Sequence, residues 1–460
     1  MLRRRTWLGL SLLSLTACVG VVQQSKQASF DEAWRTGDSV QSLALAQEYA
    51  ELNSQQRASN LLWALQLGAV ERRAGNHRAA IAAFDDAERR MHFEVNESAV
   101  AKAGESVGGL LLNDAALDYE AKYADGVMAN TYKAWSFWQL EDVANARVEF
   151  NRAEERQRLA VRYFSSQIEA QQSLVSQADD PASIDLAYDA SLKQLQRQQA
   201  QLFEPTWRAY DGYVNPFTTY SAGLFRLLYA TSANDYELAA DSFRRVYSLT
   251  GSESAQRDFN MARALAAGDS SFRPDGDVWV FIESGLSVAK REFRFGIPIY
   301  FDRSFHDYFT IALPTLQPRP THFQSASVGS DQAQQIADMD RIIGAEFKAE
   351  YPVILTREII RATLKAMATH EVAKKDDDGW ATALAMMAQI ASTSADTRSF
   401  SALPEEFNVI RTTRRNRDLY LTLANGVNKV RLDTNASAHV VYVQQVAPGT
   451  EPVIDVINIP

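Results

Sequence analysis

The sequence predicts an α+β protein in which an array of helix pairs over residues 30–268 precedes a mixed α/β domain over residues 269–460. The first region has alanine-rich helical periodicity and few prolines, whereas the second has short runs of β-favouring residues separated by turn signals. The composition changes at Gly268-Asp269-Ser270-Ser271, and we expect mainly antiparallel strands beyond that point.

The first eighteen residues have the organisation of a secretory leader. Arg3 to Arg5 form a basic start, and the apolar run over residues 7–15 leads into Leu15-Thr16-Ala17-Cys18. A basic start, a short apolar core and small residues before a cleavage site are typical of a signal peptide. The run is far shorter than the roughly 20 apolar residues of a membrane-spanning helix. We therefore expect loss of residues 1–17 by cleavage between Ala17 and Cys18.

Cys18 is the only cysteine of the chain, so an internal disulfide is excluded. The pattern Leu-Thr-Ala-Cys resembles the lipobox of bacterial lipoproteins. In that family the thiol receives a diacylglycerol, the chain is cut just before the cysteine, and the new amine is acylated. Several acyl chains anchor a protein firmly, whereas a single chain binds marginally. The alternative is an ordinary signal peptide with a chance cysteine at Cys18.

The residue after the lipobox cysteine indicates in which bacterial membrane a lipoprotein is retained. In lipoproteins of this kind an aspartate at that position favours retention in the inner membrane. Val19 stands there in this chain. The resemblance therefore implies a lipid anchor in the bacterial outer membrane, with the protein facing the periplasm.

Composition limits the partners and the number of domains. Loss of residues 1–17 removes three arginines, which leaves 44 basic against 57 acidic residues and a mature net charge of −13. An acidic envelope protein is a poor candidate for binding nucleic acid or anionic lipid. A chain of this length should form two or three domains. Residues 18–29 are predicted to be a lipidated polar tether that reaches at most about 40 Å.

Three stretches of the helical region resemble tetratricopeptide units. Residues 61–94 carry Leu67-Gly68, Gly75-Asn76, Ala80, Phe84 and Ala87, and small residues at Gly68 and Ala80 would let two antiparallel helices approach closely. Similar but weaker patterns occupy residues 127–160 and 220–253. The resemblance implies a TPR-like array that binds peptides or proteins on its concave face. The alternative is a generic helical bundle without true repeats.

An insertion interrupts this array at about residues 154–205. It is predicted to be a helical hairpin, with Asp179-Asp180-Pro181 at the turn between its two long helices. Its glutamine-rich composition suggests that the hairpin is solvated.

The stretch from Tyr210 to Phe217 contains three aromatic residues and the turn signal Asn215-Pro216. Tyr213, Asn215 and Phe217 are candidate partner-binding residues if the stretch is an exposed recognition loop. The alternative, which we favour, is a structural loop whose aromatic side chains fill the junction between the hairpin and the third helix pair.

The C-terminal region alternates between strands and helices. Val278 to Ile282 is a continuous apolar run, which suggests a strand covered on both faces. Two further strands are expected around 293–300 and 308–312, then helices over 331–350 and 356–375 separated by Tyr351-Pro352. A short apolar helix is predicted over 380–392. The last strands are expected around 407–412, 418–423, 428–432, 438–445 and 453–457, with a tight hairpin turn at Asn425-Gly426.

We find no catalytic signature. The six histidines are scattered, His370-Glu371 lacks the second histidine of a metalloprotease helix, and the nucleophile-elbow and phosphate-loop motifs are missing. No metal and no cofactor are therefore expected. The remaining candidate is Asp396 with Arg398, where the arginine could clamp an anion or carboxylate. The structural alternative, which we favour, is that the pair fixes its own loop into the last sheet.

Four short motifs together resemble a family of bacterial lipoproteins that join tetratricopeptide-type helices to a C-terminal mixed domain. They are Leu-Thr-Ala-Cys at 15–18, Val-Asn-Pro-Phe at 214–217, Leu-Pro-Thr-Leu at 313–316, and Asp396-Thr-Arg-Ser-Phe with Leu403-Pro404. The resemblance covers nearly the whole mature chain and implies no established catalytic residues. Members are often encoded near a lipoprotein that resembles activators of peptidoglycan synthases.

These observations lead to three functional hypotheses. The first is a membrane-anchored, periplasm-facing, non-catalytic scaffold or assembly factor, whose partners are other envelope proteins with peptidoglycan-synthesis components as candidates. The second is a peptidoglycan-binding protein or envelope enzyme with its site in the C-terminal domain. The third is a subunit of an oligomeric envelope assembly.

Overall fold

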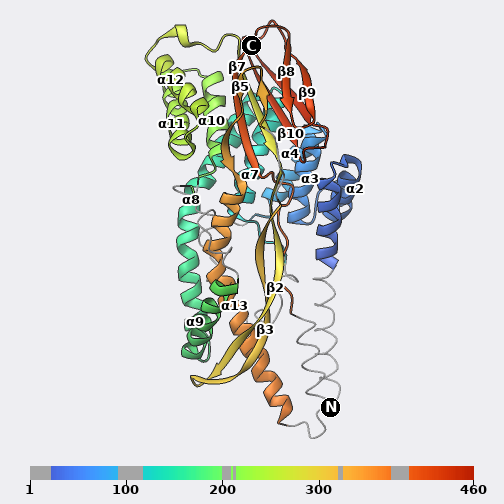
Figure 1. The fold of residues 1–460 in the computed structure, drawn as a ribbon, viewed down its shortest axis with the longest axis vertical. Helices are drawn as coiled ribbons and strands as arrows, with labels where there is room; N and C mark the ends of the chain where they lie inside the picture. Colours follow the sequence, from blue (N-terminus) through green and yellow to red (C-terminus); the bar gives the residue numbers. More distant parts are fainter. Residues whose placement is uncertain (1–21, 92–117, 199–208, 211–213, 320–324, 375–392) are drawn as a thin grey trace.

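The computed structural model describes residues 22–91, 118–198, 209–210, 214–319, 325–374 and 393–460. These residues form an α+β fold, with helices in the N-terminal part and most strands in the C-terminal part, which confirms the predicted class (Figure 1). A helix over residues 22–35 comes first. It is followed by α2 (Ser39–Ala50), α3 (Leu61–Arg73), α4 (His77–Glu88), α7 (Tyr123–Gln139), α8 (Val143–Ser176), α9 (Pro181–Gln198), α10 (Pro216–Leu228), α11 (Ala233–Thr250) and α12 (Glu253–Ala266).

Three helix pairs lie where the sequence patterns place them, namely α3 with α4, α7 with α8, and α10 with α11. The close approach expected at Gly68 is present in the first pair. A Cβ atom at Gly68 would lie 2.6 Å from the ring of Phe84, which is fully buried. The glycine therefore leaves room for the phenylalanine of the partner helix.

The predicted tether is shorter than expected. Residues 22–35 are helical, so residues 22–29 do not form an extended linker. Phe30 anchors this helix because it is fully buried and its ring lies edge-on to Trp63 at 5.5 Å between centroids. The structure describes this helix from Val22, four positions after Cys18.

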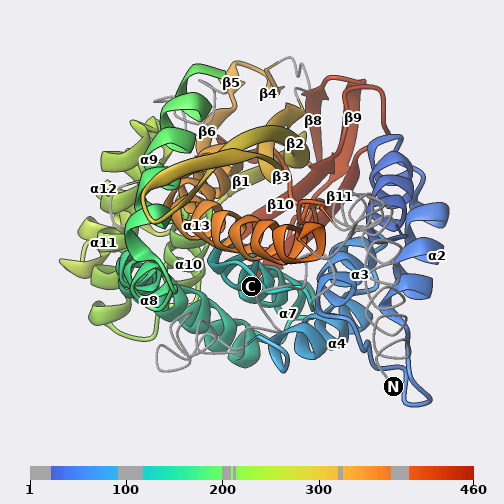
Figure 2. The ribbon, with the colours of Figure 1, turned by 90° about the horizontal axis from the view of Figure 1, so that it is seen from below.

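The helices form an arc around a central sheet (Figure 2). The five-stranded sheet has the order β11-β10-β1-β7-β6, and only β1 and β10 pair in parallel among its described neighbours. The strands are β1 (Asp277–Ser284), β6 (Gln334–Asp338), β7 (Glu406–Thr413), β10 (Ala438–Gln445) and β11 (Val453–Ile459). A four-stranded sheet of β4 (Ser327–Val328), β5 (Asp331–Gln332), β8 (Asp418–Leu423) and β9 (Gly426–Arg431) covers its other face.

Strand β1 is covered on both faces, as its apolar run predicts. Trp279 and Phe281 belong to the apolar cluster shared with the helices, whereas Val278 and Val280 belong to the cluster between the two sheets. Successive side chains of a strand point to opposite faces, which explains this division. The tight hairpin at Asn425-Gly426 is also present between β8 and β9.

The inner face of the helix arc is therefore filled by the protein's own sheet. One apolar cluster runs from the N-terminal helices through Trp135 and Phe217 to Phe281 and Tyr442. The predicted boundary at 268/269 separates helices from strands along the sequence, but both regions pack around this common core. A partner bound on the concave face of the array, as the tetratricopeptide resemblance implies, would have to displace the sheet.

A long projection extends from one end of this body (Figure 1). We call it the arm, and it consists of the distal part of α8, α9, the hairpin of β2 (Leu286–Phe301) and β3 (Ser304–Arg319), and α13 (Met339–Ala373). It has an apolar core of its own, in which Leu174, Ile184, Ile297 and Leu355 are buried. The predicted helical hairpin insertion corresponds to its outer part, with Asp179-Asp180-Pro181 at the turn, although α8 continues unbroken from Val143.

Two predictions at the arm are wrong. The helices expected over 331–350 and 356–375 are a single helix, α13, that contains Pro352, and residues 331–332 and 334–338 are strands. Tyr351 and Val353 are buried beside the proline, and this packing offsets the cost of the missing hydrogen bond.

The hairpin is also much longer than the two short strands predicted. Pro298 and Pro314 lie within its strands rather than ending them. Both strands are at an edge in a two-stranded sheet, where proline is tolerated because outward-facing N–H groups need no partner. The apolar helix predicted over 380–392 lies outside the described residues.

Candidate functional site

The segment over residues 393–403 is held between the N-terminal helices and the base of the arm. Gln66 on α3 donates to the carbonyl of Ser399 at 3.2 Å and to the Ser401 hydroxyl at 2.9 Å, and it accepts from the amide of Ala402 at 3.1 Å. Arg319 donates to the carbonyl of Ser401 at 2.9 Å. These contacts make the segment a structural connection between regions far apart in the sequence.

Asp396 and Arg398 lie on this segment and bind each other. Nε and Nη2 of Arg398 donate to the two carboxylate oxygens of Asp396 at 2.8 and 2.9 Å. The guanidinium is nearly buried, and it lies 5.8 Å from the ring centroid of Tyr119. This bidentate pairing engages the donors that a carboxylate clamp would need, so the geometry favours the structural role for the pair.

The loop before α10 is part of the core rather than a recognition surface. Asn215 caps α10, because its side chain accepts from the amides of Phe217 at 3.0 Å and Thr218 at 3.4 Å. Phe217 is fully buried and stacks on Phe407 with 3.7 Å between ring centroids. The partner-binding assignment of Asn215 and Phe217 is therefore wrong, because neither is accessible. Tyr213, Ala17 and Cys18 lie outside the described residues.

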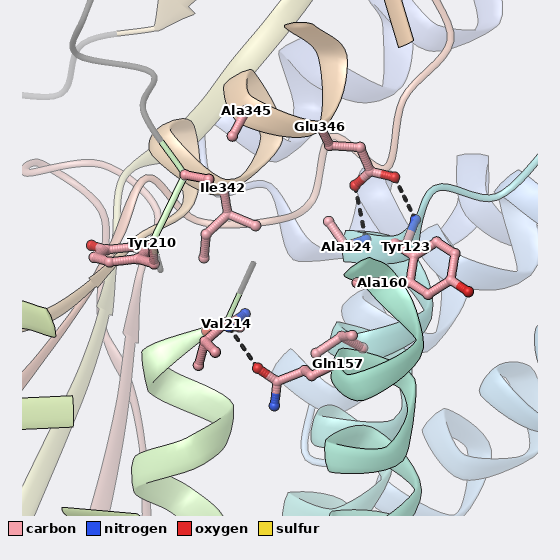
Figure 3. A pocket seen from close by; sticks show the side chains of 12 residues that line it. Tyr123, Ala124, Gln157, Ala160, Tyr210, Val214, Ile342, Ala345 and Glu346 are labelled. Carbon is pink, nitrogen blue, oxygen red and sulfur yellow. Dashed lines mark hydrogen bonds between the residues drawn. The ribbon is translucent and has the colours of Figure 1, made fainter. Parts of the chain in front are cut away.

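A cluster of ionisable side chains lies around the N-terminus of α7, and Figure 3 shows one of them, Glu346. Glu346 of α13 points at this terminus, and the two oxygens of its carboxyl group accept from the amides of Tyr123 at 2.6 Å and Ala124 at 3.0 Å. The carboxyl group thereby satisfies amides that have no partner within the helix. Glu350, one turn further along, accepts from the ammonium of Lys122 and from the hydroxyl of Tyr163, each at 2.7 Å. This cluster joins α13 to α7 and α8.

Burial dominates the electrostatics of the cluster. Burial and the nearby carboxylate of Glu350 raise the pKa of Glu346 to about 8. Burial and the charge of Lys122 lower the pKa of Lys290, which lines a neighbouring cavity. That cavity and the one beside Glu346 each have a volume of about 30 Å³. This is room for roughly one water molecule rather than for a sugar or peptide substrate.

The raised pKa of Glu346 predicts a pH-dependent stability. The folded protein keeps this proton up to about pH 8, whereas the unfolded chain loses it near the ordinary glutamate pKa of 4.5. The stabilisation is therefore complete below about pH 4.5 and is lost as the pH rises through 8. Relative to Glu346→Gln, the wild type should lose up to about 1.4 kcal/mol of unfolding free energy per pH unit across this window.

Urea unfolding at a series of pH values measures this difference. Glu155→Gln is the matched control, because Glu155 is an exposed carboxylate on α8. The control should follow the wild type, and parallel curves for the wild type and Glu346→Gln would contradict the assignment.

A larger cavity, of about 340 Å³, lies at the far end of the arm. Its walls come from the start of α9, the turn of the β2–β3 hairpin and the last turns of α13. Ile184 and Ile360 form buried parts of its wall, and Leu364 and Met367 continue the apolar lining. Asp179, Asp302 and His370 add polar groups. The volume is within the range of small-molecule sites, and an apolar lining with a few polar groups is typical of them.

Sequence reasoning missed this cavity and the charge cluster. The three walls of the cavity come from segments around residues 180, 301 and 364, and no local pattern shows that they meet. The turn of the β2–β3 hairpin lies against α9. Its backbone is held to the start of α9, because Asp302 donates its amide to Asp180 at 3.0 Å and Arg303 donates its amide to Ser183 at 2.9 Å.

Within the described ranges, no group of histidine, cysteine, aspartate and glutamate side chains is arranged to hold a metal ion. None of the helices in those ranges is long and apolar enough to cross a membrane. Comparison with known proteins adds no relative, because no protein-family model matches the chain and no curated protein is significantly similar to it.

Proposed function

We propose that the chain is a lipid-anchored, periplasm-facing protein of the bacterial outer membrane that acts as a non-catalytic binding or assembly factor. The observation that carries the proposal is the position of the only cysteine, directly after Leu15-Thr16-Ala17 at the end of a short apolar leader. Among the described residues, the two cavities at the charge cluster have a volume of about 30 Å³ each, and this small size supports a binding role over catalysis there.

The architecture supports a partner that binds outside the helix arc. The inner face of the arc is occupied by the sheet, whereas the arm projects away from the body (Figures 1 and 2). We therefore place the binding function on the arm and on the outer helix surface. TPR-like repeats remain part of this proposal, and the resemblance makes components of peptidoglycan synthesis the first partners to test.

Replacing Cys18 tests the anchor. In Cys18→Ala the acyl acceptor is lost, so we expect the protein to leave the outer-membrane fraction and to lack the mass of acyl chains on its N-terminal peptide. Density-gradient fractionation and mass spectrometry measure both effects. Ser25→Ala is the control, because Ser25 is exposed on the first described helix. A wild-type protein with an unmodified Cys18 would contradict the proposal.

Crosslinking of the native lipidated protein, followed by mass spectrometry, tests the binding role. We expect one dominant envelope protein, crosslinked to the arm or the outer helices and lost in Cys18→Ala. Crosslinks confined to residues of the inner helix face would contradict the assignment of the partner surface.

A further inference from the structure

We propose that the cavity at the end of the arm receives an arginine side chain and the apolar side chain next to it from a partner protein. This site deepens the binding role proposed above and rests on it. Three observations carry the assignment: an apolar floor with an aromatic wall, two carboxylates at the rim that have no partner among the described residues, and an exposed aromatic surface around the cavity.

The floor of the cavity is apolar and comes from two helices. Ile184 on α9 and Ile360 on α13 are buried in it, and the half-buried Leu364 and the exposed Met367 continue it. Its volume of about 340 Å³ is roughly ten times that of the cavities beside the charge cluster, which have room for one water molecule. The floor therefore has room for an apolar side chain together with part of a second one.

Aromatic rings of the β2–β3 hairpin form one wall of the cavity. Tyr300 and Phe301, which directly precede the hairpin turn, are half-buried in this wall. A planar guanidinium stacks on such rings and is weakly hydrated, whereas the ammonium of lysine is compact and strongly hydrated. The wall therefore favours arginine over lysine as the basic side chain.

The acidic side chains of the lining differ in their availability. Asp180 is used within the fold, because it accepts from the amides of Ser183 at 3.2 Å and Asp302 at 3.0 Å. A hydrogen bond with the Ser183 side chain and the charge of Arg303 lower the pKa of Asp180. Among the described residues, no hydrogen bond or ion pair engages the exposed carboxylates of Asp179 and Asp302. These two groups are placed to accept the donors of a guanidinium.

The rings around the cavity continue into an exposed surface. The ring centroid of Tyr300 lies 6.1 Å from that of Phe305, which lies 5.2 Å from that of Tyr308. Phe305 and Tyr308 are 54% and 64% exposed. His370 of the lining meets His306 of the hairpin edge-on at 5.3 Å, and a neutral imidazole can also accept a hydrogen bond.

This surface favours a protein over a small molecule as the source of the cation. A small molecule in the cavity would leave the exposed rings uncovered, whereas a partner protein would cover them. Aromatic side chains, methionine and arginine are enriched at protein interfaces. The cavity lies at the end of the arm, away from the sheet, where a partner meets no obstruction from the helix arc (Figure 1).

Peptide photolabelling tests the site. The probe is a blocked Leu-Arg-Leu peptide in which both leucines are photoleucine, and mass spectrometry of the full-length protein gives the labelled positions and the concentration dependence. We expect labels around Tyr300 and Ile360. Replacing the arginine of the probe with citrulline keeps its shape and removes its charge, so binding should weaken about tenfold as a charged hydrogen bond is lost.

Removing the charges of the rim should have the same effect. Asp179→Asn with Asp302→Asn should weaken binding of the arginine probe about tenfold. Asp185→Asn with Asp189→Asn is the matched control, because it removes two exposed charges of α9 that do not line the cavity. The control should bind the probe as the wild type does.

Filling the floor tests the apolar half of the site. Leu364→Trp should also weaken binding about tenfold, the factor expected when a few methylene groups lose their burial. Leu186→Trp is the control, because Leu186 is exposed on α9 and does not line the cavity. All variants should keep the thermal unfolding midpoint of the wild type, so that a loss of binding reports the cavity and not the fold.

Equal binding of the arginine and citrulline probes would overturn the inference, as would wild-type affinity in either cavity variant. Acetyl-arginine amide that binds as tightly as the probe would also overturn it, because a free small cation would then suffice. A native partner crosslinked to the outer helices, with no probe bound at the arm, refutes this site alone. A protein without any crosslinked envelope partner refutes the binding role proposed above.

Discussion

Replacing Arg72 with methionine should lower the free energy of unfolding by about 3–5 kcal/mol, the cost of breaking a buried ion pair. Arg72 on α3 is paired with Glu283 on β1, and both side chains are buried. The guanidinium also lies over the rings of Tyr132 at 4.0 Å and Tyr442 at 4.9 Å. Without the arginine, the carboxylate of Glu283 would remain buried, and among the described residues the hydroxyls of these tyrosines, at 2.7 and 2.8 Å, would be its remaining donors.

Chemical denaturation measures the loss, and a double variant tests its origin. Arg72→Met with Glu283→Leu removes both charges, so it should be more stable than Arg72→Met alone, because no unpaired charge stays buried. Arg35→Met is the control, since Arg35 forms an exposed pair with Glu32 and such pairs contribute little. A loss in Arg72→Met no larger than in Arg35→Met would show that the pair does not hold the sheet against the helices.

Truncating Phe217 to alanine should lower the free energy of unfolding by about 3–5 kcal/mol, as expected for a phenylalanine in a packed core. Phe217 stacks on Phe407 of β7 and lies 6.2 Å from Trp135 of α7, so its ring is shared by α10, the sheet and the helix arc. The void would open at the centre of the protein, where neighbouring aromatic rings are too large to fill it.

Phe305→Ala is the matched control, because the same truncation is made at an exposed ring of the arm. It should change stability by less than about 0.5 kcal/mol. Thermal or urea unfolding of the two variants measures the difference between truncating a ring in the core and truncating an exposed ring. If Phe217→Ala kept wild-type stability and lost only partner binding, the recognition-loop hypothesis would stand and the structural assignment would fail.

Features that depend on neighbouring residues could be predicted from the sequence. The turn at Asp179-Asp180-Pro181, the hairpin turn at Asn425-Gly426 and the doubly covered strand at Val278 to Ile282 follow from local propensity and pattern. The close packing at Gly68 could also be predicted, because small residues at helical spacing indicate that another helix packs closely there, even when that helix is not yet identified.

Features that depend on distant contacts could not be predicted. Pro352 is a helix breaker by itself, yet α13 continues through it because Tyr351 and Val353 pack in the arm. Asn215-Pro216 predicts a turn whose aromatic side chains fill a junction, but the pattern does not show that Phe217 stacks on Phe407, almost two hundred residues away. The charge cluster also depends on a distant contact, because Glu346 accepts a hydrogen bond from an α7 amide that lies 223 residues earlier in the sequence.

The sheet inside the helix arc has a consequence for biosynthesis. The aromatic side chains that line the arc, such as Trp135, are covered by β1 and by β10, whose residues follow near the end of the chain. A nascent chain emerging N-terminus first therefore presents these side chains to solvent until almost all of it has been made. Such long-range strand pairing forms slowly and leaves apolar surface open meanwhile. We expect this order of assembly to make the chain depend on chaperone protection while it folds, and to make prematurely ended chains subject to rapid proteolysis.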